Sequence, residues 1–594
     1  MRRSNSLWKT TVVSISAMMT VSMGAAVWAA STEKTTQESQ SDQAIENETE
    51  KITEDSETKE DSNNTENQTS EPQSAKDASD SSENQTEECK IELSDDGILV
   101  DGEAISTDSE SAVYAGADIV YYKEGQDSTY GAGGEDDGHS EEEAAEHTVV
   151  TITKAGTYRV SGTLSKGQIA IDLGEDSRDD ESAVVNLILN NADITCTVAS
   201  GIVVYNAYEC GSDDTETATK DVDTTNAGVH IILADDSENT VNGSHVAKIY
   251  KEGTTQEDVD AGNAKKQWKF DAAIDSLVSI AFDAEEEETG TLAVNSDNEG
   301  IETSLHLTIN GGTITVNSND DALNANEDGV SVITINGGVL TCNAGGGQEG
   351  DGIDSNGWIV INDGFIVSAA SATSPDSGVD SDNGIYINGG TVLASGNMYD
   401  EVSEDSEQAF VALNFASSVE AGQMFALKNA DGEIVTAFSA ANDFQTLVYS
   451  SSELTDGDYT LCEISSADGV AVSGLYTEVT SVSDEVQLQG SNGAGGFGGM
   501  GGGMGKPNGE RPEMPEGEES SMPEGEMPSG QEGEVPSKPE GEAPSGQNGE
   551  RPERPEDSSE EASSVFTISG ISNNFSHISE LTTEAYEEES STNV

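Results

Sequence analysis

The sequence predicts an all-β protein: a parallel β-helix, which is a solenoid of short stacked strands, followed by a small β module. From about residue 90 to 488, short runs of β-branched residues are broken by Gly, Asn and Asp. Sustained helical periodicity is absent there, and stretches such as "TYRVSG" and "QIAIDL" alternate apolar and polar residues. A motif also recurs at a constant interval, which is the signature of a repeat architecture.

The recurring motif is an asparagine followed by Gly-Gly or Asp-Gly at the end of an apolar run. It occurs as "INGGTITV", "INGGVLTC", "INDGFIVS" and "INGGTVLA", with the asparagines at 310, 336, 362 and 388, so each step is 26 residues. The same step sets Leu307, Ile333, Ile359 and Ile385 in one column. Each repeat is therefore expected to form one coil, with its asparagine hydrogen-bonded along the stack. A propeller blade would need about 40 residues or more.

Two segments precede the solenoid, which is expected at residues 90–404. Residues 1–29 have a basic start, an apolar run and a small-residue cleavage site, which predicts a signal peptide, with an uncleaved membrane anchor as the alternative. Residues 30–88 contain almost no large apolar groups, which predicts a disordered acidic linker. A secreted, extracellular monomer follows, free or loosely associated with the cell envelope.

Three segments follow the solenoid. Residues 405–488 lose the repeat but stay strand-like, and "MFALKNADGEIVTAF" predicts a hairpin within this C-terminal β module. Residues 490–562 are rich in Gly, Pro and Glu, which predicts a disordered tail. Residues 563–594 form a short C-terminal segment, whose apolar island "VFTISGISNNF" can supply one returning strand.

The charge of the chain limits its partners. There are 115 Asp and Glu against 25 Lys and Arg, a net charge of −90. Nucleic acid is excluded as a partner, because affinity for phosphates requires positive charge. The remaining explanations are solvated acidic tails and carboxylates that hold metal ions, and both are expected, in different segments.

Carboxylates gather in the loops that precede the repeat strands, in a region without Lys or Arg between Lys269 and Lys428. The loops "NEGIETS", "DDALNAN", "GDGIDSNG" and "DSGVDSDNG" share a small residue, an aliphatic residue and then a carboxylate or amide. Equivalent residues of stacked coils lie about 4.8 Å apart, so Asp354 and Asp380 are expected to be neighbours. In the second loop, Asn324 and Asp328 both remain possible equivalents.

Like charges at this distance need a compensating cation, and extracellular Ca²⁺ takes six to eight oxygen ligands. Calcium is therefore the expected cofactor; solvated turn residues are the alternative. The candidate metal ligands are Glu302, Asp320, Asp321, Asp351, Asp354, Asp376, Asp380 and Asp382.

Three residues are candidates for carbohydrate binding. Strand parity turns Trp358 and Tyr386 outward in adjacent coils, and His306 shares the column of Trp358. An exposed aromatic face beside calcium would bind a sugar ring and its hydroxyls. The alternative is that loops or the C-terminal module cover these side chains.

The chain resembles a known family. "ITKAGTYRVSGTLSKGQIAID", "FDAAIDS" and the coils that run from "DDALN" or "GDGID" to "INGGT" are similar to the calcium-binding, carbohydrate-binding β-helix proteins of clostridia and relatives. The resemblance covers roughly residues 90 to 488. It implies a right-handed β-helix with a polysaccharide-lyase-like fold, bound calcium, and binding of pectic polysaccharide or cellulose without cleavage. The acidic linker, the tail and an acidic insertion near residues 121–147 depart from the family pattern.

Three functions compete: a non-catalytic carbohydrate-binding protein, a pectate-lyase or polygalacturonase-like enzyme, and a structural surface adhesin or spacer. A lyase needs a strong base, usually Arg or Lys; Lys265, Lys266 and Lys269 lie just outside the best-defined coils and could serve only if their loop folds back. A polygalacturonase needs two carboxylates, which are abundant here. We favour the non-catalytic binder and assign no catalytic residue. Because such an acidic surface repels an anionic glycan, the ligand is expected to be a neutral glycan, or an anionic one held through bridging Ca²⁺.

Overall fold

The computed structural model describes residues 88–492 and 562–581, which are almost entirely β-strand. The helical exceptions within these ranges are α1 (Glu141–Ala144), α2 (Gln256–Asp260) and one 3-10 turn. The all-β prediction is therefore confirmed. The predicted signal peptide, nearly all of the predicted linker and tail, and the chain beyond residue 581 lie outside the described residues. Among the helices of the described ranges, none is long and apolar enough to cross a membrane.

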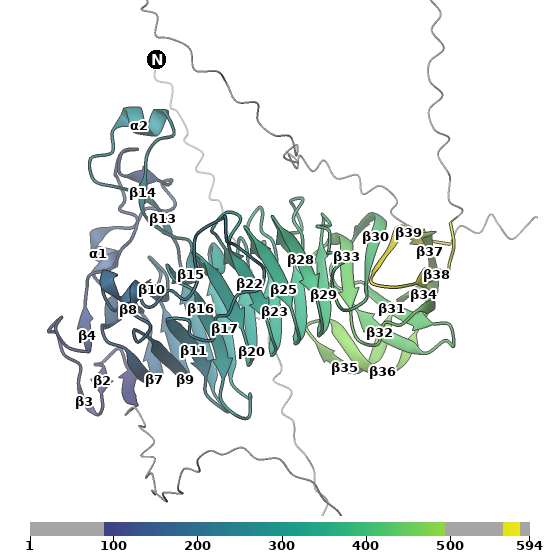
Figure 1. Cartoon of the computed structure of the whole chain (residues 1–594), viewed down its shortest axis with the longest axis horizontal. Helices are drawn as coiled ribbons and strands as arrows, with labels where there is room; N and C mark the ends of the chain where they lie inside the picture. The colour runs from purple at the N-terminus through teal and green to yellow at the C-terminus, as the bar shows by residue number, and fades with distance from the viewer. Residues whose placement is uncertain (1–87, 493–561, 582–594) are drawn as a thin grey trace, which may run out of the picture. The chain divides into compact units, whose positions relative to one another are not determined.

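Strands of successive repeats pair in parallel, in two ladders whose strands follow one another in chain order (Figure 1). The first ladder contains β16 (Ile280–Ala284), β19 (His306–Ile309), β22 (Val332–Ile335), β25 (Trp358–Ile361) and β28 (Gly384–Ile387). The second contains β17 (Thr291–Ser296), β20 (Thr313–Asn317), β23 (Val339–Asn343), β26 (Phe365–Ala369) and β29 (Thr391–Gly396).

A separate nine-stranded sheet supplies the third strand of each repeat. Its order is β27 (Asp380–Ser381), β24 (Ile353–Ser355), β21 (Leu323–Ala325), β18 (Glu299–Thr303), β15 (Ala272–Ser276), β10 (Ile202–Asn206), β8 (Gly167–Asp172), β6 (Thr148–Ile152) and β4 (Val113–Gly116). All its pairings are parallel except that of β4 with β6.

The predicted 26-residue columns are confirmed. Leu307, Ile333, Ile359 and Ile385 pair one after another and are fully buried. Full burial of such a side chain stabilises the fold by about 1.5–3 kcal/mol. The repeat asparagines form the expected ladder, because each Nδ2 donates to the Oδ1 of the asparagine one repeat earlier, at 2.9 Å for Asn336, Asn362 and Asn388.

The C-terminal β module has its own aromatic core. β31 (Met424–Asn429) and β32 (Ile434–Phe438) form the predicted hairpin. Phe415, Phe425 and Phe444 pack together, with ring centroids 5.1 to 6.5 Å apart. The apolar island near the C-terminus supplies two strands rather than one, β38 (Phe566–Ile568) and β39 (Ser572–Glu580). β39 completes the module by pairing with β30 (Phe410–Val419) and β37 (Val486–Asn492).

A small antiparallel sheet covers part of the nine-stranded sheet. It consists of β5 (Gly131–Ala132), β13 (Val246–Tyr250) and β14 (Lys266–Phe270). Val246, Ile249 and Phe270 from this small sheet pack in one apolar cluster with Ala170 of β8 and Val203 of β10. No residue of β15 belongs to this apolar cluster, and the strands that follow β15 carry the acidic loops.

Candidate functional site

One row of side chains crosses the nine-stranded sheet on the face opposite the aliphatic core. On β15, β18, β21, β24 and β27, the register aligns Asp275, Glu302, Asn324, Asp354 and Asp380, which we call the acidic row. The neighbouring Ile274, Ile301 and Ile353 lie in the core. The register thus makes Asn324, not Asp328, the equivalent of Asp354, and it confirms that Asp354 and Asp380 are neighbours.

The same row continues on the other four strands with a different character. Its members there are Val203, Ala170, Thr151 and Tyr114, on β10, β8, β6 and β4. No carboxylate belongs to this half of the row. The change from aspartate to apolar side chain falls between β15 and β10, where Asp275 pairs with Val203.

Three aspartates meet at one end of the acidic row. Asp351, Asp354 and Asp380 each place a carboxyl oxygen within 4.8 Å of the others, and we call them the aspartate cluster. The main chain fixes this geometry: the Ser377 amide donates to Asp351 Oδ1, and the Asp351 amide donates to Asp321 Oδ1, both at 2.6 Å. Carboxylate oxygens gathered in this way are the ligands that Ca²⁺ prefers.

The carboxyls of the aspartate cluster hold protons unusually tightly. Burial and then the charge of Asp380 raise the pKa of Asp351 to about 9 and that of Asp354 to about 7. Burial and the charge of Asp400 raise the pKa of Asp380 to about 7, and burial and Asp354 raise that of Asp321 to about 8. In the described ranges, no lysine or arginine forms an ion pair with these four residues. A cation would remove this repulsion.

A second group of carboxylates lies farther along the row and does have a protein cation. Asp271, Glu299 and Glu302 gather their oxygens within 4.8 Å. Lys269 Nζ lies 2.8 Å from Asp271 Oδ2 and 3.5 Å from Glu302 Oε1. The expectation that this region lacks a basic partner is therefore wrong at Glu302, because β14 carries Lys269 back onto the acidic row.

The charge state of Lys269 follows from its neighbours. Burial alone would lower the pKa of its ammonium, but the charges of Glu302, Asp271 and Glu299 outweigh burial and raise it. Lys269 is therefore protonated at neutral pH. A protonated amine cannot accept a proton, so it cannot act as a general base in this arrangement.

Two buried oxygen atoms of the acidic row have no hydrogen-bond partner among the described residues: Glu302 Oε2 and Asn324 Oδ1. Glu302 is 4 % exposed and Asn324 is 7 % exposed. A buried acceptor without a partner costs about 1–3 kcal/mol, so an additional cation or water at this place would stabilise the site.

The remaining predicted ligands surround the aspartate cluster rather than join it. Asp376 Oδ2 accepts a hydrogen bond from the Gly350 amide at 2.6 Å. Asp320 is half-buried, and burial followed by the charge of Glu349 raises its pKa. Asp382 is exposed, and its charge contributes to the raised pKa values of Asp354 and Asp380.

The predicted carbohydrate-binding residues lie on the first ladder. Trp358 and Tyr386 are half-buried, and His306 does share the column of Trp358, through Val332. His306 itself is 2 % exposed, so it cannot contact a ligand in this conformation. Burial lowers its pKa to about 4, and its neutral Nδ1 accepts a hydrogen bond from the Val332 amide.

Residues 207–228, which we call the covering segment, explain the burial of His306. An added Cβ at Gly211 would stand 2.5 Å from His306 Cδ2. Thr224 Oγ1 lies 2.6 Å from Thr308 Oγ1, and Lys220 Nζ lies 5.0 Å from the centre of the Tyr386 ring. The alternative that a loop covers this face is thus confirmed at His306.

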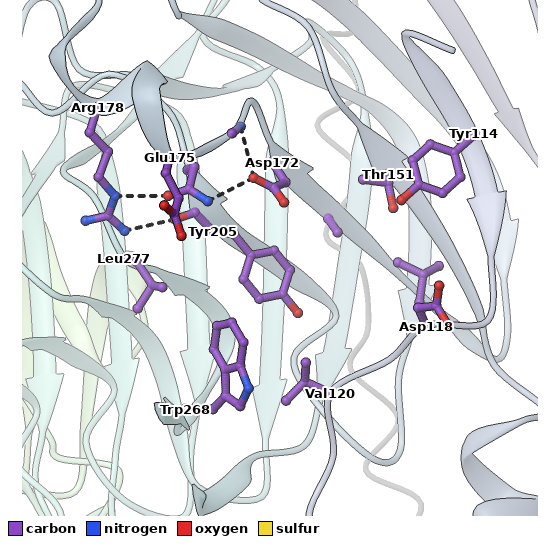
Figure 2. A pocket seen from close by; sticks show the side chains of 14 residues that line it. Tyr114, Asp118, Val120, Thr151, Asp172, Glu175, Arg178, Tyr205, Trp268 and Leu277 are labelled. Atoms are coloured by element: carbon purple, nitrogen blue, oxygen red, sulfur yellow. Dashed lines mark hydrogen bonds between the residues drawn. The ribbon is translucent and has the colours of Figure 1, made fainter. Parts of the chain in front are cut away.

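Several residues of the site were not predicted. Asp275 could have been found, since "AAIDS" has the small-aliphatic-carboxylate pattern of "GIETS". Glu299 could also have been found, because it stands two residues before Ile301, as Asp321 and Asp351 stand before Leu323 and Ile353. Lys269 and Asp271 carry no repeat signal. A cavity of about 490 Å³ on the other half of the sheet was also missed; Figure 2 shows the rings of Tyr205 and Trp268 at its centre.

One comparison with known proteins supports a carbohydrate-binding role. A family model described as "Carbohydrate-binding domain-containing protein" matches residues 146–216 and 213–469, more than half of the chain. No curated protein matches. A solved structure, "Structure of the polysaccharide lyase-like protein from C. thermocellum, Gadolinium derivative", is 22 % identical and covers 51 % of this chain and 92 % of its own, with a TM-score of 0.29.

Proposed function

Because the chain belongs to the family of carbohydrate-binding domain-containing proteins, we propose that it is a secreted, non-catalytic protein that binds a polysaccharide with the help of calcium. The observation that carries this proposal is the aspartate cluster, in which three carboxyl groups share one small space without a lysine or arginine partner in the described ranges. We propose pectic or cellulosic cell-wall material as the ligand.

Calcium fits the residues that are present. Asp351, Asp354 and Asp380 would hold the ion, and Asp321 and Asp382 stand next to them. The ion would supply positive charge where burial and then repulsion raise the pKa of each carboxyl group. It would also supply a bridge to the carboxylates or hydroxyls of a glycan. The second group differs, since the ammonium of Lys269 already supplies part of its compensating charge.

We further propose that the three sets of parallel strands close into a right-handed parallel β-helix. Each repeat contributes one strand to the first ladder, one to the second and one to the nine-stranded sheet. Short strands that pair only with the preceding and following repeat are what stacked coils require. On this scaffold the acidic row would lie along one side of the solenoid, and a polymer would reach it at its half-buried members, Asp354 and Asp380.

A glycan array with and without chelator tests the proposed function. We expect retention of pectic or cellulosic glycans in calcium. Retention of an anionic glycan should disappear when the chelator removes the ion, because the acidic row would then repel it. An array on which no glycan is retained in calcium would contradict the proposal and favour the adhesin or spacer.

The enzyme remains the competing function, and it makes a separate prediction. A pectate lyase would need a deprotonated base beside the aspartate cluster, whereas Lys269 is held protonated by three carboxylates. We therefore expect no unsaturated product when the protein is incubated with polygalacturonate and calcium. A rise in ultraviolet absorbance from such products would overturn the non-catalytic assignment.

A further inference from the structure

A cavity on the covered half of the nine-stranded sheet has the composition of a sugar-binding pocket. It measures about 490 Å³ and lies between the outer side of β6, β8 and β10 and Trp268, in the middle of β14, with Tyr114, Asp118 and Val120 also lining it. Ligand pockets in proteins usually measure about 300–1,000 Å³. The cavity lies on the half of the sheet that has no acidic row, so it is separate from the proposed calcium site.

Two aromatic rings from different sheets form the centre of this pocket. Tyr205 of β10 and Trp268 of β14 meet edge to face, with ring centroids 5.7 Å apart. Phe270 fixes both of them from the buried side, at 5.4 Å from Tyr205 and 5.6 Å from Trp268. Both rings are half-buried and line the cavity, so part of their apolar surface stays open to a ligand. The apolar face of a sugar ring can pack against rigid aromatic surface of this kind.

Polar groups at fixed positions surround the rings. Arg178 donates from Nε to Asn206 Oδ1 at 3.1 Å and from Nη2 to the Tyr205 carbonyl at 2.9 Å. Asn206 Nδ2 in turn donates to Asp172 Oδ1 at 2.9 Å. Figure 2 shows this network on one side of the rings, with Asp118 on the other side. The donors and acceptors of this network, together with the exposed carboxylate of Asp118, can be matched by the hydroxyl groups of a sugar.

The charge of the pocket selects among glycans. Asp118, Asp172 and Glu175 line it together with a single cation, Arg178, so carboxylates are in excess. No ion pair with a carboxylate engages Arg178 within residues 88–492 and 562–581. An anionic sugar would meet like charge, which costs binding energy, whereas a neutral sugar would not.

We propose that this pocket binds one neutral sugar residue of a polysaccharide, without calcium. The ring would lie against Tyr205 and Trp268, with its hydroxyls toward Arg178, Asp172 and Asp118. The ligand class rests on the proposed carbohydrate-binding function, but the site and its independence of calcium do not. The protein would then hold a polymer at two places on one sheet, by two different chemistries.

Calorimetric titration of the full chain tests this inference. The probes are cellotetraose, xylotetraose, mannotetraose and β-1,4-galactotetraose, all neutral, and tetragalacturonate, all in chelator. We expect at least one neutral probe to bind and tetragalacturonate not to bind. Trp268→Ala should weaken the neutral probe by about tenfold or more, as loss of a central aromatic contact does. Glu404→Gln, at an exposed position that does not line the pocket, should leave its affinity unchanged.

A second variant tests the pocket in case Trp268→Ala does not fold. Asp118 is exposed at the edge of the pocket, so Asp118→Lys should fold normally and still weaken the neutral probe several-fold. Absence of binding by every neutral probe in chelator, or equal affinity in wild type, Trp268→Ala and Asp118→Lys, would overturn the inference. If calcium-dependent retention of a polysaccharide persists in that case, the proposed function stands and the pocket alone fails. If no glycan binds under either condition, both fail.

Discussion

The two halves of the nine-stranded sheet share one register but are built for different surroundings. On β10, β8, β6 and β4 the outer row is Val203, Ala170, Thr151 and Tyr114, and a small sheet packs over part of it. On β15, β18, β21, β24 and β27 the same row is acidic. The apolar side chains on β10, β8 and β4 need a protein cover, whereas the closely spaced carboxylates of the acidic row need a cation.

β14 serves both halves through adjacent residues. Trp268 lines the pocket of the covered half, and Lys269 reaches Asp271 and Glu302 of the acidic half. Because side chains alternate along a strand, consecutive residues can serve different surroundings. One strand outside the repeat thus supplies both part of the apolar cover and the cation of the acidic half.

The largest expected effect comes from removing that cation. Lys269→Met leaves buried carboxylates without their partner, and loss of one member of a buried ion pair costs about 3–5 kcal/mol. We expect the urea midpoint at pH 7 to fall accordingly, with an unchanged m-value. Lys265→Met, at an exposed position of the same segment, is the control and should have no effect. An equal loss in both variants would contradict a specific role for Lys269.

Calcium should have the next largest effect, and only through the acidic half. A ligand that binds the folded state alone stabilises it by about 2.7 kcal/mol at one hundred times its dissociation constant. We expect the thermal midpoint to rise with calcium in the wild type and in Trp268→Ala, but not in Asp354→Asn/Asp380→Asn. A calcium-induced rise that survives the double substitution would place the ion elsewhere.

The calcium-free protein should lose stability as pH rises. The pKa values of Asp351, Asp354 and Asp380 are raised in the fold to about 9, 7 and 7, above the ordinary aspartate value of 3.8. A carboxyl whose pKa is raised by folding contributes stability below its unfolded pKa, and this contribution is lost as pH rises through its folded pKa. The thermal midpoint in chelator should thus fall between pH 4 and pH 9. A midpoint that rises over this range would contradict the account.

Removing a single charge from the aspartate cluster should change the free energy of unfolding least. The sign of the change shows whether the carboxylate is repelled by its neighbours. In chelator at pH 9, Asp380→Asn should stabilise the protein by about 1 kcal/mol, since two unit charges about 4 Å apart repel by that amount in water. Glu404→Gln removes an exposed carboxylate that is not among the charges raising the pKa values of the cluster, and it serves as the control. Chemical unfolding at this pH measures both. Destabilisation by Asp380→Asn would mean that the carboxylate is not under repulsion.

The sequence predicts what the repeat determines and little of what lies outside it. Parallel in-register stacking turns a 26-residue step into a spatial contact, so the Asp354–Asp380 pair and the Asn336–Asn310 hydrogen bond follow from spacing alone. Spacing alone does not decide whether Asn324 or Asp328 is the equivalent of Asp354, because a local insertion changes the 26-residue step. Only the pairing register identifies Asn324.

The contacts that could not be predicted involve segments that lack the 26-residue sequence repeat. His306 is buried by the covering segment, whose path over the first ladder has no repeat or strand pattern to reveal it. Lys269 reaches Glu302 because of how the small sheet packs, which depends on tertiary contacts and not on local propensity. The pocket at Tyr205 and Trp268 forms between two sheets from residues far apart in the chain.

Calorimetric titration of Ca²⁺ into the chelator-treated, dialysed protein tests the central claim most directly. The account predicts binding to the wild type, unchanged binding to Glu404→Gln, and loss of that binding in Asp354→Asn/Asp380→Asn, because these two carboxylates adjoin on β24 and β27. Proton release should accompany binding near pH 7, since calcium displaces protons from carboxyls of raised pKa. Equal calcium binding by the wild type and the double variant would contradict the account.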